Sequence, residues 1–197
     1  MFRRQQRAQP VGASSENFWG ALKGVWFAPR RFFERLDPGV GFFRPAIFAS
    51  IVLYLNLLLE AALQAVWLRE FNFALIYAPF LGLVVALVLA PLLVAGLTVL
   101  VLVVLDGAPS RRSFGPVFRA LAYASGIGAV LWIPYAPLLA IPYGAFVATV
   151  AVKETLHIRW GRAAAGALIP LSALLLILLL LTGPSEAAGF LRNPPGS

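Results

Sequence analysis

Three polar residues interrupt the first long apolar stretch of the chain at intervals of four. Asn56, Glu60 and Gln64 lie within residues 43–67, so a helix over this stretch places all three side chains on one face. A carboxylate flanked by two amides could take part in proton-linked transport or line a groove for a polar substrate. The same side chains could instead hold neighbouring helices together. We favour this second interpretation, because the basic residues are expected at the membrane surfaces, so that no cation inside the membrane is available to pair with Glu60.

A second group of polar residues follows the fourth apolar stretch, in "VKETLHIRWGR". Its members with ionisable side chains are Lys153, Glu154, His157, Arg159 and Arg162. A His near a Glu is found in acid–base and metal sites, but one His cannot build a His-rich metal site. Basic residues at the cytoplasmic end of a membrane helix need no chemistry to explain them. The cluster therefore favours anchoring over catalysis.

The remaining motifs give little support for an enzyme. The chain has no cysteine, which excludes disulfides and zinc–thiolate sites, and it has no phosphate-binding glycine loop, nucleophile elbow or HExxH motif. We expect no catalytic activity, no metal and no cofactor. Gly82, Ala86 and Ala90 recur every four residues, a spacing that lets another helix approach closely within a bundle or in a homo-oligomer.

The amino-acid composition indicates whether these residues lie in a water-soluble protein or in a membrane protein. The chain is 60% hydrophobic and 12% charged, whereas a soluble domain has about 25% charged residues. A net charge of +8 would suit a nucleic-acid partner, but long stretches without any charge favour hydrocarbon. We expect an all-α integral membrane protein that does not bind nucleic acid.

The apolar stretches predict five transmembrane helices, at 43–67, 73–105, 114–133, 137–156 and 163–182. The second has 33 uncharged residues and is interpreted as one long or tilted helix, bent near Pro91 and broken near Pro79. Prolines between the third and fourth predict a tight hairpin. Residues 1–14, which are basic, and 183–197 are expected to be disordered.

Charge placement gives this topology a direction. With five spans and a cytoplasmic N-terminus, 14 basic residues fall on the cytoplasmic side and only Arg69 and Arg192 on the other. Reading the proline-rich hairpin as a single span would leave four helices and a poorer split of 12 to 4. We expect the C-terminus outside, and the prokaryotic cytoplasmic membrane as the location.

Residues 15–42 precede the first span and include the stretch "VWFAPRRFFERLDPG". Aromatic and aliphatic residues recur at helical spacing on both sides of Pro29, which predicts two short amphipathic helices at the membrane interface. An anionic lipid surface is the expected partner, and the candidate headgroup contacts are Trp19, Trp26, Arg30, Arg31 and Arg35. Alternatively, the two helices cap the cytoplasmic end of the bundle.

Three stretches together resemble the Yip family, the Ypt-interacting-protein membrane domain, in its prokaryotic form. They are "FWGALKGVWFAPRRFFERL", "FRALAYASGIGAVLWIPYAPLLAIPYGAF" and "VKETLHIRWGRAAAGALIPL", and the resemblance covers residues 16–183. It implies five transmembrane helices and, for eukaryotic relatives, vesicle trafficking with small GTPases and membrane shaping. The long cytosolic N-terminal region and the acidic-Leu-Tyr-Gly-Pro signature of those relatives are missing here, so GTPase binding is not carried over.

Two functions follow as expectations. The first is a non-enzymatic membrane protein that organises or shapes the bilayer, or assembles with other membrane proteins or with copies of itself. The alternative is a small transporter or lipid-translocating protein that uses the polar face formed by Asn56, Glu60 and Gln64.

Overall fold

The computed structural model describes residues 17–36, 41–68, 73–107 and 111–192, and all regular elements in these ranges are helices. The expected disordered segment 1–14 lies outside the described residues. The elements are α1 (Phe18–Phe27), α2 (Pro29–Glu34), α3 (Phe43–Leu68), α4 (Phe73–Asp106), α5 (Arg111–Ala124), the 3₁₀-helix η1 (Ser125–Val130), α6 (Pro137–Leu156) and α7 (Trp160–Arg192).

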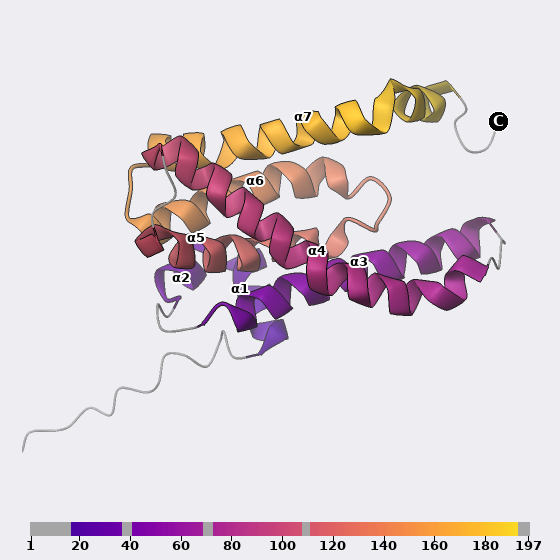
Figure 1. The fold of residues 1–197 in the computed structure, drawn as a ribbon, viewed down its shortest axis with the longest axis horizontal. Helices are drawn as coiled ribbons and strands as arrows, with labels where there is room; N and C mark the ends of the chain where they lie inside the picture. Colours follow the sequence, from indigo (N-terminus) through magenta and orange to yellow (C-terminus); the bar gives the residue numbers. More distant parts are fainter. Residues whose placement is uncertain (1–16, 37–40, 69–72, 108–110, 193–197) are drawn as a thin grey trace, which may run out of the picture.

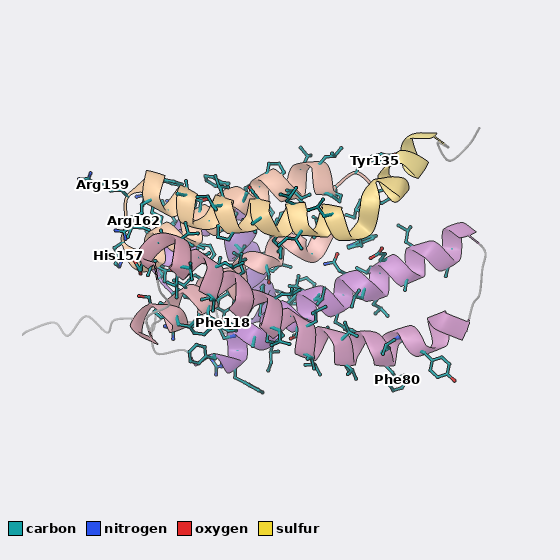
Figure 2. All side chains as sticks on the ribbon, turned by 45° about the horizontal axis from the view of Figure 1, so that its top comes forward. Phe80, Phe118, Tyr135, His157, Arg159 and Arg162 are labelled. Atoms are coloured by element: carbon teal, nitrogen blue, oxygen red, sulfur yellow. The ribbon has the colours of Figure 1, made fainter. Side chains whose placement is uncertain are left out.

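The long helices α3, α4, α6 and α7 run along the length of the molecule (Figure 1). One end gathers α2, the start of α5 and the turn from α6 to α7, whereas the C-terminal end of α7 lies at the other (Figure 1). Figure 2 shows His157, Arg159 and Arg162 at the first end and Tyr135 toward the opposite one. We call the first end the basic end.

Within the described residues, three helical stretches are long and apolar enough to cross a membrane: Phe43–Leu63, Pro79–Asp106 and Pro137–Leu156. They belong to the first, second and fourth predicted spans. The protein is therefore an all-helical membrane protein. The third and fifth spans, and with them the total of five, stay predictions.

Helix α4 corrects the prediction of a break near Pro79. It is one continuous α-helix through both Pro79 and Pro91, and it curves along its length in Figure 1. A proline removes only one backbone donor and clashes with the preceding turn, which bends a helix. Ending the helix would leave several polar groups without partners in an apolar surrounding, which is more unfavourable.

The third predicted span, 114–133, is not one continuous α-helix. Helix α5 ends at Ala124 and the chain continues as η1. Gly126 and Gly128 weaken the α-helix here, and the Ser125 hydroxyl donates to Ala122 O at 2.7 Å. Gly126 also permits a close approach, because a Cβ at this position would lie 3.0 Å from Phe48 Cζ.

Helix α7 extends beyond the predicted fifth span. It continues to Arg192, so residues 183–192 of the expected disordered tail are helical, while 193–197 lie outside the described residues. Pro184 removes one backbone donor, but Glu186, Ala187 and Ala188 after it are good helix formers. The break in composition at Gly183 is therefore not a break in the helix.

Two apolar clusters form the core. One contains the buried side chains of α1 and α2, which pack against α3, α5, η1 and α6. Val25, Phe32 and Phe33 of these short helices are almost fully buried within it. The other cluster lies between α3, α4, α5, α6 and α7. Both N-terminal helices are thus part of the bundle, in agreement with the capping alternative.

Small residues mark where helices approach closely. Ala86 and Ala90 of α4 are buried, and the neighbours nearest to Gly82 are Tyr54 and Leu57 of α3. This spacing therefore serves packing within one chain. A tighter contact lies between α7 and α4, where a Cβ on Gly166 would be 2.7 Å from Leu105 Cδ2.

The substitution Gly166→Leu tests this contact. We expect it to destabilise the protein by about 1–3 kcal/mol, because the added side chain overpacks the α4–α7 interface. The control is Gly161→Leu on the same helix, where a Cβ meets nothing within 4 Å. Thermal unfolding in detergent measures both variants, and equal melting temperatures would contradict the proposed packing.

Candidate functional site

Asn56 holds the irregular segment that follows α5. Its amide nitrogen donates to Gly128 O of η1 and to Val52 O, the latter at 3.1 Å. Its amide oxygen accepts the backbone N–H of Trp132 at 3.1 Å. Trp132 N–H thus bonds to a side chain rather than to a backbone carbonyl. The Asn56 side chain satisfies backbone groups that the end of a regular helix releases.

Trp26 of α1 makes a second connection to the same segment. Its indole N–H donates to Gly126 O at 3.0 Å. The backbone carbonyl of Trp26 accepts a hydrogen bond from the Tyr143 hydroxyl of α6, and the two rings lie 6.3 Å apart. One residue therefore links α1 to both η1 and α6. Trp26 was predicted to contact lipid headgroups, but its polar groups are used inside the protein.

Aromatic rings extend this connection into α2 and α3. Phe18 packs against Phe48, with ring centroids 5.2 Å apart, and Phe48 packs against Tyr123 at 5.1 Å. Phe32 meets the other side of the cluster, edge to face with Tyr123 at 5.4 Å. Such pairs contribute roughly 0.5–1.5 kcal/mol each beyond their burial. The N-terminal helices are fixed to α3, α5 and α6 by packing as well as by hydrogen bonds.

Glu154 joins the two basic clusters identified in the sequence. Its carboxylate, in a residue only 8% exposed, accepts a hydrogen bond from Lys153 Nζ at 2.6 Å and lies 3.4 Å from Arg30 Nε. Arg30 also pairs with Glu34 at 3.0 Å, and Lys153 lies over the Trp160 ring at 5.6 Å. A buried carboxylate is stable only when paired. The ion pairs thus attach α2 to the end of α6.

The remaining residues of the 153–162 cluster shape the turn and the helix ends. The Arg162 guanidinium donates to Leu105 O at 2.8 Å and to Asp106 Oδ1 at 3.1 Å, which caps the C-terminus of α4. His157 has φ 52° in the left-handed region and ends α6. His157 and Arg159 are exposed at the basic end (Figure 2). Lys153, Glu154 and Arg162 of this cluster thus make contacts between helices or cap their ends.

Glu60 lies one helical turn beyond Asn56 and is exposed. Gln64 lies in the same helix, and its side chain is outside the described residues. On the predicted polar face, Asn56 bonds to the backbone of the segment after α5. Among the described residues, no three metal-ligating side chains gather in one place.

The outward side of α1 carries residues that the sequence analysis had not all identified. Trp19, Lys23 and Phe27 are exposed at intervals of four residues, opposite the buried Ala21 and Val25. The candidate contacts Arg31 and Arg35 are exposed on and after α2. Phe27 and Lys23 were missed because hydrophobic periodicity does not tell which aromatic of a helix faces inward.

Comparison with known proteins identifies one family. The Yip1 domain family model matches residues 23–182, which includes the second half of α1, the break between α5 and η1 at Ser125, and most of α7. No curated protein and no solved structure matches the chain.

The substitution Asn56→Leu tests the contact between α3 and the irregular segment that follows α5. It leaves the Trp132 N–H without its acceptor and removes one of the two donors to Gly128 O, the other being the Leu131 N–H, so we expect a loss of about 1–3 kcal/mol in the free energy of unfolding. Glu60→Gln, one turn further along α3, is the control and should change stability little. Thermal unfolding in detergent provides the measurement. A stable Asn56→Leu protein would show that the break does not need this side chain.

The substitution Glu154→Ala tests the attachment of α2. It removes the acceptor of Lys153 and the partner of Arg30, and we expect a destabilisation of about 1–3 kcal/mol. Glu34→Ala removes only an exposed pair within α2 and should change stability by at most about 0.5 kcal/mol. If the two variants unfold at the same temperature, the Glu154 pairs do not hold α2 in place.

Proposed function

Because the chain belongs to the Yip1 domain family, we propose that it is a non-enzymatic membrane protein that organises or shapes the bilayer. It acts with membrane partners or with further copies of itself, in the prokaryotic cytoplasmic membrane. The basic end lies at the cytoplasmic side, and the C-terminus lies outside.

Element lengths support a count of five spans. Helix α5 and η1 together comprise Arg111–Val130 and extend over about 33 Å, since a 3₁₀-helix rises more per residue than an α-helix. This is enough to cross a hydrocarbon core of about 30 Å. Helix α7 has 33 residues and is apolar over 163–182. The two helices would complete the three spans that length and composition identify.

The observation that carries the proposed function is the attachment of α1 and α2 to the bundle. Phe18 contacts Phe48, near the start of the first span, and Arg30 pairs with Glu154, near the end of the fourth. The two short helices are therefore held at the level where two spans meet the membrane surface. A protein that carries a rigid, basic and aromatic unit at this depth displaces lipid in one leaflet more than in the other.

The transport alternative has less support. Broken helices serve transport when the released backbone groups bind a substrate or ion. Here Gly126 O and Gly128 O accept hydrogen bonds from Trp26 and Asn56. The side-chain amide of Asn56, the first residue of the polar face, is likewise used for hydrogen bonds within the protein. These observations favour a structural role for the break.

Reconstitution of the full chain into vesicles with anionic lipid tests the proposed function. We expect the vesicles to become smaller or tubular as the ratio of protein to lipid rises, as measured by cryo-electron microscopy. Glu60→Gln should shape the vesicles as the wild type does, because Glu60 lies on α3 and not on the N-terminal helices α1 and α2. Unchanged vesicles, together with a solute or lipid flux that Glu60→Gln abolishes, would replace the proposal with the transport alternative.

A further inference from the structure

Helix α1 is arranged in the opposite way from a helix at a water-exposed surface. The small residues Ala21 and Val25 face the protein, whereas Trp19 is 66% exposed and Phe27 is 84% exposed. Exposing large aromatic side chains to water is unfavourable in proportion to the apolar surface exposed. Lys23 lies between them on the same outward side. An aromatic, a cation and an aromatic in one row suit the headgroup layer of a membrane.

The positive charges next to this row have no ion-pair partner among the described residues. Lys23, Arg31 and Arg35 are exposed and form no ion pair within the described part of the chain. By contrast, Arg30 is paired with carboxylates. The cations on this side therefore remain available to a negatively charged partner.

The depth of this surface is fixed by contacts to two different spans. Phe18 packs against Phe48, the sixth residue of the candidate span Phe43–Leu63. Arg30 reaches Glu154, two residues before the end of Pro137–Leu156. Both contacts place α1 and α2 beside span ends, where the apolar core of a bilayer gives way to phosphates. A water-soluble protein partner could contact only the part of this surface that extends beyond the phosphates into water.

The angle between α1 and α2 is also fixed. A Cβ on Gly24 would lie 2.6 Å from Phe32 Cδ2, so only glycine allows the ring of α2 to seat against α1. Phe33 is buried beside it. The aromatic row of α1 and the arginines of α2 therefore keep a constant relative position, which reduces the entropic cost of binding.

We propose that Trp19, Lys23, Phe27, Arg31 and Arg35 form a binding surface for anionic phospholipids of the cytoplasmic leaflet. The two aromatic rings enter the boundary between headgroups and acyl chains, and the three cations bind the phosphates. Basic residues near an anionic leaflet are attracted by its negative surface potential. This inference rests on the proposed function and names the lipid class that the N-terminal unit contacts.

Quenching of Trp19 fluorescence by brominated lipids tests the proposal on the full chain in nanodiscs. The Trp19 signal is the difference between the wild type and Trp19→Phe, which keeps an aromatic ring. We expect acyl-brominated phosphatidylglycerol to quench this signal at least about twofold more than brominated phosphatidylcholine mixed at equal amounts. The preference should fall as salt rises, because exposed charges are screened.

The triple variant Lys23→Gln, Arg31→Gln, Arg35→Gln tests the cations. It should fold as the wild type does, since all three side chains are exposed, and it should be quenched equally by both lipids. Arg159→Gln, which removes an exposed cation at the α6–α7 turn, is the matched control and should keep the preference.

Two results would overturn the inference. Absence of quenching by either lipid would place Trp19 in water or against a protein, and an unchanged preference in the triple variant would exclude these cations. Neither result depends on vesicle shape. Vesicle remodelling that persists in the triple variant would leave the proposed function standing without this lipid surface.

Discussion

A backbone amide or carbonyl in hydrocarbon needs a hydrogen-bond partner from the protein itself, and this constraint determines how the molecule is built. Helix α5 ends at Ala124, which leaves backbone groups outside the regular pattern. Side chains from two other helices supply the partners: Trp26 bonds to Gly126 O, and Asn56 bonds to Gly128 O and Trp132 N–H. An irregular segment thereby becomes the point where three parts of the chain are joined.

The same contacts explain why the N-terminal helices are not a free membrane anchor. Helix α1 supplies one of the donors that the break needs, and its own Trp26 carbonyl accepts from Tyr143. Helix α2 is held in turn by buried Phe32 and by the ion pair of Arg30 with Glu154. Asn56 and Glu154, which the sequence analysis considered as candidates for chemistry, thus stabilise the assembly of helices. What remains outward is apolar surface along the spans and an aromatic, basic surface at their ends.

Much of this fold could be predicted from the sequence, because long uncharged stretches and prolines at a turn are strong local signals. The predicted span 137–156 agrees with α6, and α4 differs from its prediction by one residue at its end. The break at Ser125 was not predicted, since its stability depends on Asn56 and Trp26, which are distant in sequence. Which aromatics of α1 face inward also depends on partners from other helices, and periodicity alone does not contain that information.

The central claim is that α1 and the segment formed by α5 and η1 are one rigid unit, and hydrogen exchange tests it most directly. The full chain in nanodiscs is transferred to deuterated buffer, and the amides of Phe18–Phe27 are compared with those of α6 by mass spectrometry. The account predicts that α1 exchanges slowly, within about tenfold of the buried half of α6, because opening it would break the Trp26 and Tyr143 hydrogen bonds and expose Val25. Complete exchange of α1 within seconds, while α6 stays protected, would contradict the claim.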